Sequence, residues 1–358
     1  MGDLHRIYCF ANAVLHPSDF TLSTITMLPE AGSMISTNVD ELLAGLQVAE
    51  ADLSSITRIY NLVNAKNAVM DGDLAAPAFS DPGISLAMKN VSFSYPGSES
   101  TRDVITDISF SITAGQLVVI VGANGSGKST LLKLLTRLYD RTSGELLING
   151  QDIRKYKLSD LYEATAVLTQ DHHVYPLPLT ENIGLGNPAQ VSNEELVRIS
   201  AEKGGADAFI KTCSEGLSTQ LAPLSFSSTE DTPLANKFKE FKENREISGG
   251  ERQRLVAART FMRLTSEKIK LIVADEPSSN LDPQGELELF ENLRKEQNGR
   301  TMIFVTHRFG PLVKHADLIL CMKDGRLAEQ GNHSELIKTG GDYRKMYEIQ
   351  AEAFSSAN

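Results

Sequence analysis

One glycine-rich run between two apolar segments constrains the fold of this chain more than any other feature. The run covers residues 122–129 and reads G-A-N-G-S-G-K-S. Residues 116–121 before it form an apolar stretch typical of a buried parallel strand, and residues 131–139 after it have a helical pattern. The glycines let successive backbone N–H groups turn inward around an anion, and the helix N-terminus adds a favourable dipole. The strand, loop and helix therefore predict a site for the phosphates of a nucleotide.

The residue types in this loop indicate how each one would act on a nucleoside triphosphate. Lys128 is predicted to neutralise the β- and γ-phosphates, and the hydroxyl of Ser129 is predicted to ligate Mg²⁺. A nucleoside triphosphate and Mg²⁺ are therefore the expected ligands. The predicted nucleotide-binding residues of this segment are Gly122, Asn124, Gly125, Ser126, Gly127, Lys128, Ser129 and Thr130.

A second apolar run, at residues 271–274, ends in two carboxylates, Asp275 and Glu276. Ligands collect at the carboxyl ends of the strands in parallel sheets. Asp275 is predicted to hold Mg²⁺ through its water shell. Glu276 is predicted to orient or deprotonate the attacking water. Alone such a pair is weak evidence of a site, but beside the phosphate loop it indicates an NTPase.

The remaining apolar segments alternate between strand and helix patterns. A charged helix is predicted at residues 284–296, and further strands are predicted at residues 86–95, 105–112, 145–149, 270–274 and 301–305. This order predicts an α/β fold with a mostly parallel sheet and helices on both faces.

Composition excludes several other classes of protein. Of the 358 residues, 41% are hydrophobic and 23% are charged, which is ordinary for a globular α/β chain. The net charge of −11 has the wrong sign for holding nucleic acid, so no nucleic-acid partner is expected. Cys9, Cys213 and Cys321 are far apart, which argues against a disulfide framework or a zinc site and favours a reducing, intracellular location.

The first 83 residues differ in character from the rest. Their apolar residues have spacings of three and four, as in a heptad seam: Val39, Leu42, Leu46, Ala49, Leu53, Ile56, Tyr60 and Val63. This pattern predicts a helix, which either packs on the globular domain or serves as a docking or coiled-coil helix. Residues 71–83 are typical of a linker. No apolar run approaches the length of about 20 residues that crosses a bilayer. We therefore expect a helical segment and linker at residues 1–83 and a catalytic domain at residues 84–352, with a mobile surface insertion at residues 221–246.

Further motifs identify the kind of NTPase. Residues 247–253 read I-S-G-G-E-R-Q, residues 275–282 read D-E-P-S-S-N-L-D, and residues 305–307 read V-T-H. With these motifs the chain closely resembles the ATP-binding cassette (ABC) family over residues 86–350. Tyr95 is at the position where the family stacks an aromatic ring on adenine. Gln170 matches the family's Q-loop.

The resemblance implies that the nucleotide is ATP. It also implies a nucleotide-binding core, an antiparallel β subdomain and a helical subdomain that carries Ser248, Gly249 and Gly250. In the family two cassettes meet head to tail, so that these residues cap the γ-phosphate held by the partner. A second cassette, identical or different, is therefore an expected partner. By the same resemblance His307 contacts the γ-phosphate, and Gln170 contributes to both catalysis and Mg²⁺ binding.

Two further motifs resemble the ATPase domain of exporter-type ABC transporters. They are T-E-N-I at residues 180–183 and E-Q-G-N-H-S-E-L at residues 329–336. Residues 51–63 look like the family's segment between the last transmembrane helix and the cassette. The resemblance implies ATP hydrolysis that powers transmembrane export, with a membrane-domain partner and a location at the cytoplasmic face of a membrane. Because no membrane domain is seen, we expect either a truncated product or a separate subunit.

Several departures from the family pattern bear on this expectation. Ile247 replaces the usual leucine, Glu251 replaces the usual glutamine, and Asn280 replaces a small residue. The insertion before the signature puts coupling to a particular membrane domain in doubt. The alternatives are a soluble ABC ATPase in a non-transport process and an inactive regulatory module. The complete set of catalytic residues argues against the second alternative.

Overall fold

The computed structural model divides the chain into two compact units, Met1–Ala68 and Val69–Asn358. The residues that it describes are 7–8, 11–12, 14–16, 18, 21–65, 67, 69–75, 83–97, 103–169, 171, 173–221, 247–277, 279–307 and 311–355. Gln170 and residues 222–246 of the predicted insertion lie outside the described residues.

The first unit is dominated by one long helix, α2 (Leu22–Val63), of 42 residues. This confirms the helix predicted at residues 39–63 and extends it toward the N-terminus. The seam residues Leu42, Leu46 and Leu53 are exposed. Across the described residues, none of the helices combines the length and the apolar character needed to span a bilayer.

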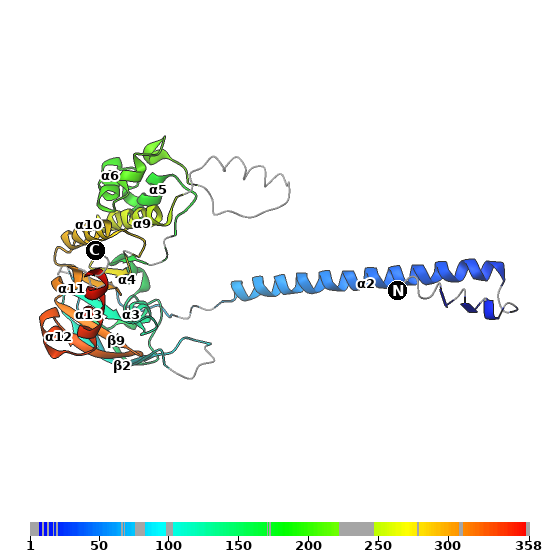
Figure 1. The fold of residues 1–358 in the computed structure, drawn as a ribbon, viewed down its shortest axis with the longest axis horizontal. Helices are drawn as coiled ribbons and strands as arrows, with labels where there is room; N and C mark the ends of the chain where they lie inside the picture. The colour runs from blue at the N-terminus through cyan, green and yellow to red at the C-terminus, as the bar shows by residue number, and fades with distance from the viewer. Residues whose placement is uncertain are drawn as a thin grey trace. The chain divides into compact units, whose positions relative to one another are not determined.

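The second unit, whose strand β9 is labelled in Figure 1, is built on a six-stranded sheet. The strand order is β10-β9-β3-β8-β7-β6. Its strands pair in parallel except for β10, which is antiparallel to β9. The strands are β3 (Leu117–Gly122), β6 (Thr165–Leu168), β7 (Leu271–Asp275), β8 (Thr301–Val305), β9 (Leu318–Lys323) and β10 (Arg326–Gly331). The continuous apolar runs become β3, β7 and β8 because both faces of these strands are buried.

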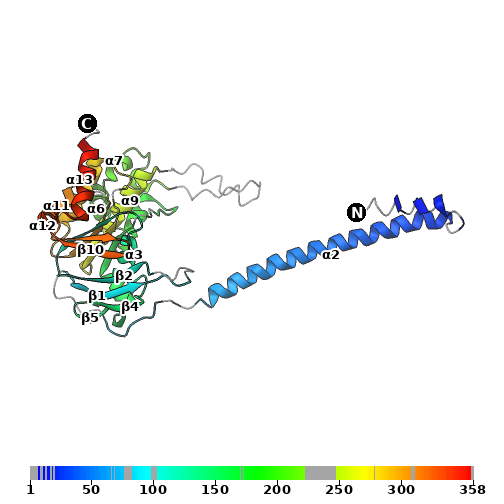
Figure 2. The same cartoon turned by 60° about the horizontal axis from the view of Figure 1, so that its bottom comes forward.

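A second sheet of four antiparallel strands has the order β2-β1-β4-β5, and Figure 2 shows these strands side by side. The strands are β1 (Leu86–Phe93), β2 (Ile105–Ile112), β4 (Ser143–Ile148) and β5 (Gln151–Asp152). Helix α3 (Lys128–Leu135) shares one apolar core with both sheets, through Leu131 and Leu134. This core fixes the helix that follows the glycine-rich loop.

Helix α4 packs into the same core as α3 through Leu161, whereas most of the other helices cover the opposite face of the six-stranded sheet or form a separate helical subdomain. Residues of α9 and α10 share a core with the sheet, and α5, α6 and α7 pack with α9 in another core. The helices are α4 (Leu158–Glu163), α5 (Leu179–Gly184), α6 (Glu194–Lys203), α7 (Asp207–Ile210), α9 (Gly249–Leu264), α10 (Pro283–Lys295), α11 (Pro311–His315), α12 (His333–Thr339) and α13 (Asp342–Ser355), with 3₁₀ turns at Ile153–Lys155, Pro188–Gln190 and Gly216–Ser218. The predicted fold class is confirmed.

One predicted element is wrong at its end. The helix expected at residues 131–139 stops at Leu135, and Arg137 has a left-handed conformation with φ 54°. The N–H of Leu138 donates to the carbonyl of Lys133 at 2.8 Å, and that of Arg137 donates to Leu134 at 3.0 Å. These two bonds form a Schellman helix end, in which an arginine stands where glycine is usual.

The start of the predicted linker is held against the cassette. Leu74 bridges to Tyr156 in parallel fashion. Its N–H donates to the carbonyl of Lys155, and its carbonyl accepts from the N–H of Lys157, both at 2.8 Å. Residues 71–75 are therefore paired with residues 155–157 of the same unit.

Candidate functional site

The glycine-rich loop lies between β3 and α3, as the sequence predicts. Gly125 and Gly127 have positive φ angles of 80° and 98°, which L-residues with a side chain rarely adopt. These conformations turn the backbone sharply between the buried strand and the first residue of α3. Asn124 and Gly125 are exposed at the outer edge of this turn.

Lys128 lies folded over its own loop. Its Nζ donates to the carbonyls of Gly122 at 2.9 Å and Ala123 at 3.0 Å. Burial lowers the pKa of Lys128, while the nearby carboxylates Glu276 and Asp275 act in the opposite direction. The structure therefore places the predicted phosphate-binding lysine close enough to both predicted carboxylates for electrostatic interaction.

Asp275 ends β7, next to the loop. Burial raises its pKa, while a hydrogen bond from the Ser129 side chain lowers it. Its Oδ1 atom is buried and has no hydrogen-bond partner among the residues that the structure describes, and the same is true of Ser126 Oγ. A buried oxygen without a partner is costly unless a ligand satisfies it. Asp275 and Ser129 thus fit the oxygen ligands that Mg²⁺ prefers.

Glu276 follows in a strained backbone conformation, with φ 48°. Its N–H donates to the carbonyl of Val305 at 2.9 Å, which ties it to the end of β8. The Oε1 atom of Glu276 lies 2.9 Å from Nδ1 of His307, whose side chain is 46% exposed. The predicted base and the histidine predicted to contact the γ-phosphate are therefore in direct contact.

These residues meet because β3, β8 and β7 are neighbouring parallel strands. Their carboxyl ends lie at one edge of the sheet, where the loop, Asp275, Glu276 and His307 follow directly. Gln170, the other predicted catalytic and metal-binding residue, lies outside the described residues.

Tyr95 lies in an aromatic cluster beside the start of α3. Its ring packs edge-on against Phe93 and Tyr139, with centroids 5.0 and 5.2 Å away. Its hydroxyl oxygen lies 3.1 Å from Thr130 Oγ1 and 3.4 Å from Lys133 Nζ. Two predicted nucleotide-binding residues, Tyr95 and Thr130, are thus joined. Sequence reasoning missed Lys133 and Tyr139.

The signature residues lie at the N-terminus of α9. Ser248 is the N-cap: its Oγ accepts from the N–H of Glu251 at 3.3 Å, and the Glu251 side chain accepts from the N–H of Ser248 at 2.8 Å. Both Ser248 and Gly249 are exposed. Glu251, noted above as a departure from the family pattern, is thus the second half of a capping box. The S-x-x-E spacing is a signal that could have identified it.

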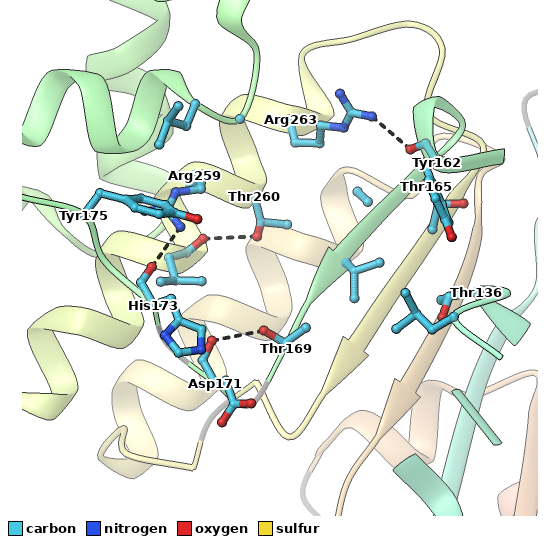
Figure 3. Close-up of a pocket in the computed structure, with 16 residues that line it drawn as sticks. Thr136, Tyr162, Thr165, Thr169, Asp171, His173, Tyr175, Arg259, Thr260 and Arg263 are labelled. Carbon is cyan, nitrogen blue, oxygen red and sulfur yellow. Dashed lines mark hydrogen bonds between the residues drawn. The ribbon is translucent and has the colours of Figure 1, made fainter. Parts of the chain in front are cut away.

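A groove of about 560 Å³ is lined by β6, by α9 and by neighbouring segments of the helical subdomain (Figure 3). Several large apolar side chains in it are 42–54% exposed: Leu138, Tyr162, Val167, Tyr175 and Leu185. Arg259 at its wall donates to the carbonyls of Asn182 at 2.8 Å and His173 at 2.9 Å. Sequence reasoning missed this groove, because its residues come from separate segments.

The fold and the loop between β3 and α3 define the class: a phosphate-loop ATPase domain. Residues 105–279 match the family model described as ABC transporter. The second unit of this chain is therefore an ATP-binding cassette ATPase domain of the ABC transporter family, which binds ATP.

Individual relatives and a solved structure agree with this membership. The chain is 35% identical over 268 residues to an ATP-dependent lipid A-core flippase of Pseudomonas fluorescens (strain Pf0-1), covering 75% of this chain and 40% of the relative. The protein of the same name from Haemophilus influenzae (strain 86-028NP) is 34% identical over 265 residues, covering 74% of this chain and 40% of the relative. A bacterial Atm1-family ABC exporter with ATP bound matches with a TM-score of 0.68 and 27% identity, over 98% of this chain and 56% of that one. The chain thus spans about two fifths of the length of these curated relatives.

Proposed function

We propose that this ATPase domain hydrolyses MgATP between two cassettes and that the hydrolysis drives transport through a membrane-domain partner. The observation that carries the proposal is the convergence of Lys128, Asp275, Glu276 and His307 at one edge of the parallel sheet. The relatives named as flippases and the exporter structure favour transport over the soluble alternative.

In the proposed nucleotide site, Lys128 leaves its two loop carbonyls and donates to the triphosphate. Ser129 and Asp275 hold Mg²⁺, with Gln170 as a further proposed ligand. When bound, the ion would neutralise charge on the phosphate oxygens. Tyr95, fixed by Thr130 and its aromatic neighbours, offers its ring to adenine.

Glu276 acts on the attacking water in this proposal. Its carboxylate accepts a proton from the water or orients the water toward the γ-phosphate. His307, 2.9 Å from that carboxylate, fixes its orientation and would donate to the γ-phosphate in this proposal. The exposed N-terminus of α9, with Ser248, Gly249 and Gly250, offers an anion site to the nucleotide of a second cassette.

The apolar groove is the proposed contact with the membrane-domain partner. Apart from the groove, few large apolar side chains are exposed among the described residues of the second unit: Met70, Leu74 and Ile349. Exposed apolar side chains gathered in one concave place mark an interaction site. A groove of this kind fits the apolar face of a short helix. The cassette would then work at the cytoplasmic face of a membrane.

Membrane co-fractionation tests the transport part of the proposal. The wild-type chain, expressed in its source cells, should sediment with membranes, and Leu138→Asp combined with Leu185→Asp should release it while ATP hydrolysis in the purified chain is retained. Ile349→Asp, at an exposed apolar residue outside the groove, is the matched control and should remain with the membranes. If the groove variant and the control fractionated alike, the groove would not be the contact.

A further inference from the structure

A buried glutamine joins the signature helix to the loop that follows the proposed catalytic base. Gln253 lies in α9, five residues after the N-cap Ser248, and its side chain is fully buried. Its Nε2 donates to the carbonyl of Pro277, and its Oε1 accepts from the N–H of Asn280 at 2.9 Å. One amide group therefore holds two backbone positions of residues 277–280.

The loop held in this way begins directly after Glu276. On its other side Glu276 is tied to β8 by its N–H bond to Val305, and the N–H of Ser279 donates back to the carbonyl of Glu276 at 3.3 Å. The strained φ of 48° at Glu276 persists only if its surroundings fix it. The bonds to Val305 and Gln253 anchor the two ends of this short segment.

A side-chain amide is unusual at a fully buried position such as that of Gln253. An apolar side chain of the same size would avoid the cost of removing a polar group from water. The amide compensates for that cost only when both its donor and its acceptor are used, as they are here. The geometry it imposes is therefore specific to the backbone of residues 277 and 280.

We infer that Gln253 is a positioning residue for ATP hydrolysis: it sets the loop after Glu276 so that the carboxylate faces the attacking water. The inference rests on the proposed role of Glu276. It also assigns a second task to α9, because the helix whose N-terminus would cap the partner's nucleotide fixes the base of its own chain. When the two cassettes close onto ATP, a shift of α9 would then be transmitted directly to Glu276 of the same chain.

The test compares Gln253→Met with wild type and with Gln220→Met. Gln220 also donates its Nε2 to a proline carbonyl, that of Pro176 at 2.7 Å, but it lies in the helical subdomain. Misplacement of a catalytic group by about 1 Å can reduce the rate about 100-fold. We expect kcat of Gln253→Met to fall by about 10- to 100-fold, with KM for ATP and ATP affinity unchanged. Gln220→Met should keep the wild-type kcat.

Gln253→Glu keeps the shape and replaces the donor with a group that can titrate. A buried carboxyl favours its neutral form, which still donates to the Pro277 carbonyl, whereas the ionised form cannot. The ratio of its kcat to that of wild type should therefore rise as the pH falls from 8 to 6. This variant keeps the inference testable if Gln253→Met fails to fold in a melting control.

The outcomes distinguish failure of this inference from failure of the proposed ATPase function on which it rests. If wild type hydrolyses ATP and Gln253→Met has the wild-type kcat, or the Gln253→Glu ratio stays flat with pH, Gln253 does not position Glu276. A fall in ATP affinity equal to the fall in kcat would also contradict a positioning role. If wild type itself does not hydrolyse ATP, the proposed function fails instead.

Discussion

Replacing Arg137 with methionine should destabilise the cassette more than the same substitution at an exposed arginine. The Arg137 side chain is almost completely buried, at 1% exposure, and it donates to backbone carbonyls on two sides. The acceptors and distances are Ile153 at 2.9 Å, Tyr156 at 2.7 Å, Met70 at 2.7 Å and Arg154 at 3.1 Å.

The magnitude follows from these bonds. Each hydrogen bond from a charged donor is worth about 1.5–3 kcal/mol, so four of them give about 6–12 kcal/mol before the cost of burying the charge. Burying the charge offsets part of this gain, and carbonyls left without a partner add to the loss. We expect the free energy of unfolding to fall by about 3–5 kcal/mol, which lowers Tm on the order of 10 °C for a unit of this size. Arg154→Met is the control, since its exposed pair with Asp152 is worth about 0–1 kcal/mol.

Urea unfolding of both variants measures the difference, and hydrogen exchange shows where it arises. The amides of Leu74 and Lys157 pair residues 71–75 with the cassette, so they should exchange faster in Arg137→Met than in Arg154→Met. If Arg137→Met were within about 1 kcal/mol of the control, the four carbonyl bonds would not carry the stability assigned to them.

Two further predictions concern the nucleotide site and acid stability. Lys128→Ala should weaken binding of a fluorescent ATP analogue by about 100-fold or more, because charge-assisted bonds are worth about 1.5–3 kcal/mol each, and wild-type affinity would refute the role of the loop. Burial raises the pKa of Asp152, but hydrogen bonds from Arg141 and Arg154 outweigh it and hold that pKa well below its ordinary value. A lowered carboxyl pKa stabilises the fold above the ordinary value near 4 and loses its effect as pH falls. The stability advantage of wild type over Asp152→Asn should therefore shrink as pH falls from about 5 to 2, and a constant advantage would contradict the assignment.

The elements that the sequence predicted well are those determined by local patterns. Buried runs such as residues 117–121 and 271–274 become strands because an apolar run bounded by turn signals has few other stable solutions. The carboxylates Asp275 and Glu276 meet the loop because parallel strands share one carboxyl edge. Both predictions depend only on the order of the apolar runs and loops along the chain.

The features that were missed depend on partners far apart in sequence. Arg137 was placed in a helix because its neighbours are apolar, and an arginine is ordinarily exposed. Its buried side chain donates to carbonyls at residues 70 and 153–156, which no local window includes. Gln253 likewise looks like an ordinary polar helix residue until the loop at residues 277–280 is folded against it.

The most direct test of the central claim is the size of Glu276→Gln with and without nucleotide. Removing the base should lower ATP hydrolysis by about 10²–10⁴ while leaving ATP binding intact. Because each ATP would be held between one chain's loop and the partner's Ser248, the variant should be a dimer with ATP and a monomer with ADP or without nucleotide. Light scattering in the three conditions gives the answer. A monomer throughout, despite measured ATP binding, would contradict a sandwich of two such chains, and full ATPase activity would contradict the assigned base.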